Sequence, residues 1–249
     1  HFPQNGEMLF TLSLILGSDV LAQLFSWLGT FLSVWWLFEM GKREAPIVVV
    51  LIACLMTVTH TAVMLLTPTA YVETLVMLWV TASALSFVRW HVNAAEPEAP
   101  RGWLALSALF AGLGVGTKYY AGVTPFILSL LLLGRWLADI RGGEPPAALS
   151  RRRDLVVFAG TAALAGAPWL LKNLWFVGNP FFPFFHQFFP ARGTGWEGAS
   201  AARYFQVLTE YGHPAGSFWR DLIAFPYLFA TSPGRFGGGA DVLGGLGWL

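Results

Sequence analysis

The composition of this chain of 249 residues excludes an ordinary soluble domain. Hydrophobic residues make up 55% of the sequence and charged residues only 12%, whereas soluble globular domains contain about 25% charged residues. A chain with so few charges cannot cover a water-facing surface of this size. The formal net charge of +1 also gives no reason to expect a nucleic-acid partner.

Several apolar segments predict helices that cross a membrane, because a spanning helix needs about 20 mostly apolar residues. A shorter apolar segment, residues 8–16, precedes them and predicts a helix lying in the membrane interface. The predicted fold class is therefore all-α, a polytopic transmembrane bundle of about six spans. These spans are expected at about residues 20–40, 46–66, 72–88, 103–116, 121–133 and 155–171.

Lysine and arginine are distributed unevenly between the two sets of connecting loops. The short loops of one side carry a single basic residue, Lys118. Because cytoplasmic loops are enriched in Lys and Arg, the opposite, basic side is predicted to be cytoplasmic and the Lys118 turn to face outward. The basic side carries nine such residues: Lys42, Arg43, Arg89, Arg101, Arg135, Arg141, Arg151, Arg152 and Arg153.

The sequence changes character after the last predicted full span. From Lys172 onward it combines several prolines and many phenylalanines with charges of both signs, which is too aromatic for a flexible linker. We therefore predict a multi-span membrane domain over residues 1–171, a large folded extracytoplasmic loop over residues 172–240 and the start of a further span over residues 241–249. The first residue is His and the last lies in an apolar run, so truncation is expected at both ends.

Acidic residues on the predicted outer face are few, and two of them are candidates for a polar site. Glu7 and Glu73 each stand at a predicted helix start, where a carboxylate stabilises the positive end of the helix dipole. That structural role is the alternative to a catalytic one. Glu73 is also the only acid between Glu44 and Glu96, at a membrane boundary where desolvation is costly.

Lys118 lies between two short apolar helices and directly precedes Tyr119 and Tyr120. A lysine at headgroup level beside two hydroxyl groups suits a lipid-linked phosphate; the alternative is a lysine that only extends its ammonium group to the interface. Lys172 and Asn173 follow the sixth predicted span and are further candidates for phosphate binding. For Lys172 the alternative is interaction with the last carbonyl groups of its helix.

Three histidines are weaker candidates for function. His60 lies deep in the second predicted span, where an interhelical hydrogen bond is the expected role. His186 and His213 fall in the predicted outer loop, and their spacing supplies no partners for a metal ion.

Four patterns follow one another along almost the whole chain: His1-Phe2-Pro3-Gln4 before Glu7-Met8-Leu9-Phe10; Ala70-Tyr71-Val72-Glu73; Gly112-Leu113-Gly114-Val115-Gly116-Thr117-Lys118-Tyr119-Tyr120; and Pro168-Trp169-Leu170-Leu171-Lys172-Asn173 with Gly178-Asn179-Pro180-Phe181-Phe182-Pro183. In order, sidedness and spacing they resemble the GT-C class of integral-membrane glycosyltransferases. The resemblance is to the bacterial branch, like the dolichyl-phosphate-mannose protein mannosyltransferases and the lipid A aminoarabinose transferase.

The resemblance implies sugar transfer from a polyprenyl-phosphate donor to a lipid, glycan or protein acceptor. The reaction is expected on the outer face of a multi-pass protein in the bacterial inner (plasma) membrane. Glu73 and Glu7 are then candidates for the carboxylate that takes the acceptor proton. The candidates for stabilising the leaving phosphate are Lys118, Tyr119, Tyr120, Lys172 and Asn173.

The usual catalytic acid of the family lies in the first outer loop, soon after the first span. The chain begins near the end of that loop by this resemblance, so the main base is expected to precede residue 1 and the chain to be inactive alone. Some relatives use a divalent metal, and the sequence leaves the cofactor open.

Two other classes of function remain open at this stage. A transporter or flippase of lipid-linked or small solutes often has inverted repeats and broken helices at the membrane midplane, but the two halves of this sequence show no repeat. A non-catalytic membrane assembly subunit predicts instead that the outer charged residues are dispensable.

Overall fold

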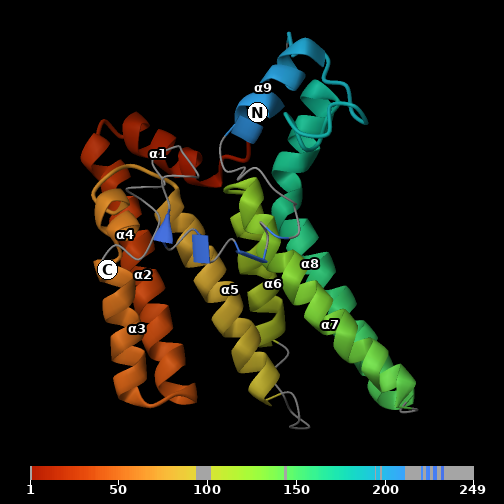
Figure 1. The fold of residues 1–249 in the computed structure, drawn as a ribbon. Coiled ribbons are helices and arrows are strands. Elements are labelled where there is room, and N and C mark those ends of the chain that lie inside the picture. Colours follow the sequence, from red (N-terminus) through yellow and green to blue (C-terminus); the bar gives the residue numbers. More distant parts are fainter. Residues whose placement is uncertain are drawn as a thin grey trace.

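The computed structural model describes residues 2–93, 102–142, 145–193, 195–196 and 198–210, and a few isolated positions between 220 and 232. Every regular element in these residues is helical, which confirms the predicted all-α class (Figure 1). His213 and the predicted span over residues 241–249 lie outside them. The elements are α1 Asn5–Ile15, α2 Asp19–Glu44, α3 Ile47–Thr59, α4 Thr61–Leu66, α5 Glu73–Asn93, α6 Gly102–Val115, the 3₁₀ turn η1 Tyr119–Gly122, α7 Val123–Arg141, α8 Pro145–Val177 and α9 Gly198–Glu210.

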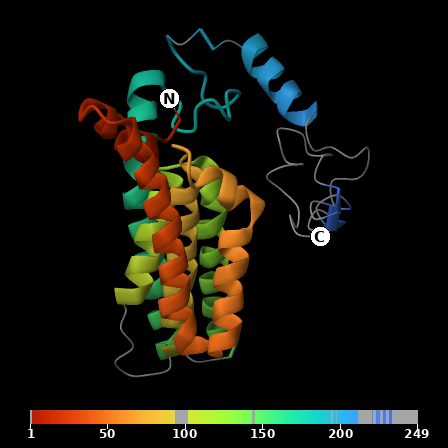
Figure 2. The ribbon, with the colours of Figure 1, turned by 90° about the vertical axis from the view of Figure 1, so that its left-hand side faces the viewer.

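The long helices form a row whose order follows from the contacts between neighbours. α3 packs on α2, α2 on α5, α5 on α6, α6 on α8, and α8 on α7. Figures 1 and 2 show these helices side by side, with α9 beyond their ends. Large buried side chains join the middle of the row, from α5 to α8, and include Phe87, Trp90, Leu104, Leu132 and Phe158.

Four described segments are long and apolar enough to cross a membrane, so the sequence-based count of about six spans was too high. The second predicted span is divided into α3 and α4, and α6 has only 14 residues, or about 21 Å of helix against a hydrocarbon core of about 30 Å. The four segments are Asp19–Glu44, Glu73–Asn93, Tyr119–Arg141 and Ser150–Val177.

The division between α3 and α4 lies at His60. Its backbone leaves the helical region, with φ −64° and ψ 130°, and its Nδ1 accepts a hydrogen bond of 3.2 Å from the N–H of Ala62. His60 therefore caps the start of α4 within its own segment. This hydrogen bond is local, because the first N–H groups of a helix have no partner within the helix; the predicted interhelical bond of His60 stays a prediction.

Small polar side chains lie inside the bundle beside its apolar core, while many large apolar side chains lie on its outer surface. Ser83 and Ser107 are fully buried, and each hydroxyl bonds to the other residue's carbonyl oxygen at 2.8–2.9 Å. Thr30 and Thr67 pair at 2.8 Å between α2 and the turn after α4. The outer face of α3 instead exposes a run of Ile, Val and Leu side chains. Burying small residues and exposing large apolar ones suits a bundle surrounded by lipid.

α1 lies across the ends of α2 and α5, as expected for an interfacial helix (Figure 1). Gly6 makes this approach close, because a Cβ there would stand 2.5 Å from a side-chain carbon of Val72. Gly17 allows the sharp turn into α2 with a φ of +77°, which favours glycine. Ser18 then caps α2 by accepting a hydrogen bond from Leu21.

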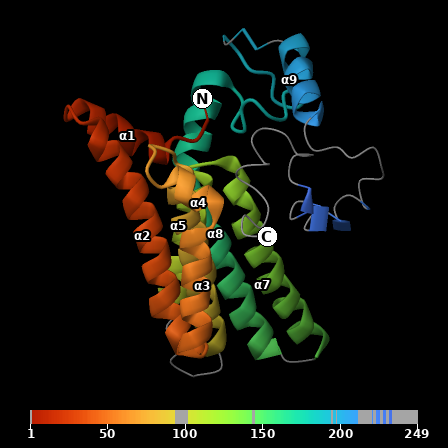
Figure 3. The same cartoon turned by 60° about the vertical axis from the view of Figure 1, so that its left-hand side comes forward.

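Figure 3 shows the two ends of the bundle, and the residues that these ends carry differ in charge. One end, here called the arginine-rich end, holds the ends of α2, α5 and α7 and the start of α8, with all the described residues of the predicted cytoplasmic set. The opposite end, here called the Lys118 end, holds α1, the turn before α5, the turn before η1 and the end of α8. The charge bias of the sequence thus corresponds to two ends of one bundle.

Candidate functional site

Glu73 and Lys118 form an ion pair at the Lys118 end, although 45 positions separate them in the sequence. Glu73 is the first residue of α5, and Lys118 lies in the turn between α6 and η1. Their side chains are 28% and 34% exposed, so both are accessible from outside the bundle. The Lys118 ammonium also lies 5.8 Å from the centre of the Tyr120 ring, within the range of a cation–π contact.

The end of α6 determines where Lys118 lies. The N–H groups of Thr117 and Lys118 both bond to the carbonyl oxygen of Gly114 at 2.9 Å, and Lys118 is extended, with φ −151° and ψ 140°. Gly116 allows the close contact at this turn, because a Cβ there would stand 2.4 Å from Nδ2 of Asn5 and would force that side chain to shift. The glycine-rich pattern before Lys118 therefore lets α1 approach the turn.

Asn5 fixes this turn from a distant part of the sequence. Its N–H donates to the carbonyl oxygen of Gly116 at 3.0 Å, and its Nδ2 donates to that of Leu113 at 3.3 Å. Its Oδ1 accepts a hydrogen bond of 2.6 Å from Nε1 of Trp169. Asn5 was absent from the sequence-based candidates, because no local pattern indicates that it contacts α6 and α8.

Tyr119 connects the same turn to the end of α8. Its hydroxyl accepts a hydrogen bond of 3.0 Å from Nδ2 of Asn173 and donates one of 3.4 Å to the carbonyl oxygen of Pro180. Asn173 is fully buried. Both residues were predicted to bind phosphate, and the structure brings them together in a contact that positions the backbone beside Lys118.

The two remaining candidates have surroundings different from those of the Glu73–Lys118 pair. The Lys172 ammonium lies 4.6 Å from the centre of the Trp169 ring, which is a cation–π contact. Glu7 lies in the first turn of α1, where its Oε2 is buried without a hydrogen-bond partner among the described residues. Both residues are linked to the Lys118 turn through Asn5. Trp169, the partner of Lys172, donates a hydrogen bond to Asn5, and Glu7 lies in the same first turn of α1 as Asn5.

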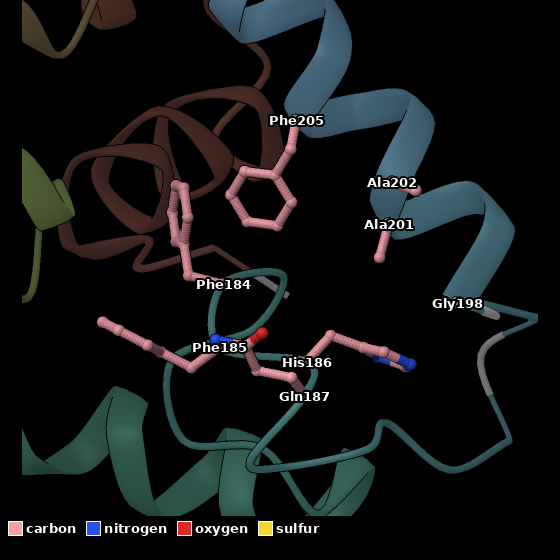
Figure 4. Close-up of a pocket in the computed structure, with 8 residues that line it drawn as sticks. All are labelled: Phe184, Phe185, His186, Gln187, Gly198, Ala201, Ala202 and Phe205. Carbon is pink, nitrogen blue, oxygen red and sulfur yellow. The ribbon is translucent and has the colours of Figure 1, made fainter.

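A cavity of about 690 Å³ adjoins this site between the segment after α8 and α9 (Figure 4). The ring of Phe184 borders the cavity and meets the ring of Tyr119 edge-on, with centroids 5.8 Å apart. Nδ1 of His186 is buried without a hydrogen-bond partner among the described residues. The lining residues are Phe184, Phe185, His186, Gln187, Gly198, Ala201, Ala202 and Phe205.

The described residues contain no group of three or more His, Cys, Asp or Glu side chains that could hold a metal ion. His186, which the sequence placed in a predicted outer loop, lies in the cavity wall, and no such group of described residues forms around it. The polar groups around the Lys118 turn include one carboxylate–ammonium pair, two tyrosines and a buried amide.

The fold and its four candidate spans define an integral membrane protein with a polar cluster at one end of its helices. A model of the dolichyl-phosphate-mannose-protein mannosyltransferase family matches residues 15–179, about two thirds of the chain. The chain belongs to this family and is a GT-C class membrane glycosyltransferase of the mannosyltransferase type. No curated protein and no solved structure matches it.

The match covers α2 to α8 and therefore includes the Glu73–Lys118 pair, Tyr119 and Asn173. Asn5, Glu7 and the cavity residues lie outside the matched range. The family match thus supports the class of enzyme, while the individual roles of the site residues depend on their geometry.

Proposed function

We propose that this glycosyltransferase moves a sugar from a polyprenyl-phosphate donor to a hydroxyl group of a protein, glycan or lipid acceptor. The reaction takes place at the Lys118 end, which faces away from the cytoplasm. The observation that carries this proposal is the Glu73–Lys118 pair, partly exposed within the matched family range. The nine-to-one bias of basic residues supports the orientation, and the resemblance supports the bacterial inner membrane.

In the proposed step, a carboxylate oxygen of Glu73 takes the proton of the acceptor hydroxyl. The acceptor oxygen then forms a bond to the anomeric carbon of the sugar. The bond between that carbon and the phosphate oxygen breaks, and the polyprenyl phosphate leaves with the bonding electrons. Glu7 is a second candidate for the proton acceptor, because it lies in the first turn of α1 at the same end.

Negative charge accumulates on the phosphate as the sugar leaves, and Lys118 is the proposed group that stabilises it. An ammonium group has three N–H donors for phosphate oxygens. Tyr120 lies beside this ammonium and is half exposed, so its hydroxyl is proposed as a neutral donor. Tyr119 and Asn173 are proposed to hold the turn, since their polar groups already bond to each other.

The cavity beside Phe184 is the proposed approach for the acceptor. Phe184 touches Tyr119, which directly follows Lys118, so the cavity and the ion pair are neighbours through a single ring contact. A volume of about 690 Å³ falls within the range of pockets that bind small molecules or side chains, about 300–1,000 Å³. No step is assigned to a metal, because the described residues supply no group of ligands for one.

The experiment that tests this function is a transfer assay with the full-length protein in liposomes and a radiolabelled polyprenyl-phosphate sugar. Lys118→Ala should raise the donor KM by about tenfold to 150-fold, which corresponds to the loss of a charged hydrogen bond of about 1.5–3 kcal/mol. Lys118→Arg should recover part of this loss, because the charge remains while the geometry changes. Glu73→Gln should lower kcat by about 100-fold or more.

Movement of the donor across the membrane without transfer to an acceptor would indicate a flippase instead. If Lys118→Ala and Glu73→Gln both transfer the sugar as fast as the wild type, this site takes no part in the reaction. The ion pair would then have a structural role.

A further inference from the structure

The two carboxylate oxygens of Glu73 have different surroundings. Oε1 is paired with the Lys118 ammonium, whereas Oε2 is buried and has no hydrogen-bond partner among the described residues. Buried polar atoms without a partner are rare, because they lose their hydrogen bonds to water without replacing them. Only one of the two Glu73 carboxylate oxygens therefore has a partner in this arrangement, and the other has none among the described residues.

The Lys118 ammonium group can bind a phosphate in place of the Glu73 carboxylate. Its bonded partner is an anionic oxygen, and a phosphate offers oxygens of the same kind in greater number. A lysine side chain has a flexible four-carbon stem, while the Lys118 backbone is held by the bonds of Gly116 to Asn5 and of Tyr119 to Asn173. The ammonium can therefore change partner without movement of the turn.

The position of Glu73 favours its negative charge independently of the lysine. It is the first residue of α5, and the N-terminus of a helix stabilises a negative charge. A carboxylate that separates from an ammonium group accepts a proton more readily, because the opposite charge no longer favours its ionised form.

From these three observations we infer that Glu73 occupies the phosphate position of Lys118 and is exchanged for the phosphate of the arriving donor. The exchange frees the Glu73 carboxylate for the acceptor hydroxyl. Oε2 is covered in this structure, so a hydroxyl reaches it only after neighbouring groups move. Donor binding thus activates the proton acceptor and must precede productive binding of the acceptor. This inference rests on the proposed function. It adds that the donor binds before the acceptor and that donor binding activates Glu73.

The exchange predicts that removing the Glu73 charge tightens donor binding while it slows transfer. The probe is undecaprenyl phosphate, titrated against the purified full-length protein in detergent micelles. Glu73→Gln should lower the Kd by about tenfold, because the phosphate no longer competes with a carboxylate. Lys118→Ala should raise the Kd by about tenfold or more. The double variant should bind like Lys118→Ala, since the gain from Glu73→Gln requires the lysine.

Glu44→Gln is the matched control. Glu44 pairs with Arg89 at 2.7 Å across 45 positions, with side chains 22% and 26% exposed, but at the arginine-rich end. Its removal should leave the Kd unchanged. Glu73→Asp, which keeps the charge on a shorter side chain, should bind the probe more tightly than the wild type but less tightly than Glu73→Gln.

The possible failures are distinguishable. An unchanged Kd in Glu73→Gln together with weaker binding in Lys118→Ala would overturn the exchange and leave the phosphate role of Lys118 intact. Weaker binding in Glu73→Gln would also overturn it, because Glu73 would then position the lysine for phosphate. An unchanged Kd in Lys118→Ala would overturn the proposed donor site itself.

Discussion

Nε1 of Trp169 donates a hydrogen bond of 2.6 Å to Oδ1 of Asn5, although 164 positions separate the two residues. The same asparagine bonds to the carbonyl oxygens of Leu113 and Gly116. The start of α1, the end of α6 and the C-terminal part of α8 therefore meet at one side chain. The turn that carries Lys118 comes directly after Gly116, one of the residues that bond to Asn5.

Asn5→Ala tests the junction. The change leaves Nε1 of Trp169 without its partner and removes one of two hydrogen bonds to the carbonyl oxygen of Leu113, which keeps the bond from the Thr117 hydroxyl. This loss should lower the free energy of unfolding by about 1–3 kcal/mol. The donor KM should rise as the Lys118 turn loosens. Asn93→Ala is the control, because Nδ2 of Asn93 bonds only within α5, to the carbonyl oxygen of Arg89. Unfolding in SDS titrations and donor kinetics are the measurements; equal behaviour of the two variants would contradict the prediction.

The contact of α6 with α8 depends on Gly112. A Cβ at this position would stand 2.4 Å from the carbonyl oxygen of Ala162 and 2.5 Å from the Cβ of Ala165. Gly112→Ala should therefore separate the two helices and lower stability by about 1–3 kcal/mol. Gly134→Ala in α7 should be neutral or stabilising, since nothing lies within 4 Å of a Cβ there and alanine favours a helix. Thermal unfolding of both variants checks this, and a stable Gly112→Ala would show that the helices readjust.

The cavity next to Phe184 can be filled from an exposed position. Ala202 lines the cavity and is exposed, so Ala202→Trp should occupy the space without disturbing buried side chains. We expect at least a tenfold higher acceptor KM, by analogy with losing about 1.4 kcal/mol of binding, and an unchanged donor KM. Ala199→Trp on the same helix is the control, since Ala199 is exposed and outside the cavity lining. Similar acceptor kinetics in both variants would exclude the cavity from acceptor binding.

The orientation can be measured by cysteine labelling in a Cys54→Ala background, because Cys54 is the single cysteine of the chain. Cysteines at Asn93, the last residue of α5, and at Gly142, directly after α7, lie at the arginine-rich end. Both should react with impermeant reagent only from the cytoplasmic side. A cysteine at Gly195, between α8 and α9, should react only from outside. Labelling of Gly142 from outside would reverse the orientation and place the Glu73–Lys118 pair on the cytoplasmic side.

The sequence by itself determined the class of fold and the chemical difference between the two ends. Hydrophobic segments must be helical in a membrane because no water is present to satisfy backbone groups, and a low charge content is visible without a structure. The same reasoning separated Lys118 from the basic residues of the other side. Glu73 and Lys118 were both candidates from sequence, because charges at a membrane boundary are few.

Only the tertiary structure decided which of these residues meet. Hydropathy gives no information on the rotation or packing of a helix. It therefore could not predict the bond between Asn5 and Trp169, the pairing of Glu73 with Lys118, or the contact of Lys172 with the Trp169 ring. The number of spans was overestimated for a related reason: apolar length does not reveal that His60 turns back to cap α4, nor that α6 is short. Contacts between distant segments depend on close packing, and packing depends on side-chain shapes that meet only in the folded chain.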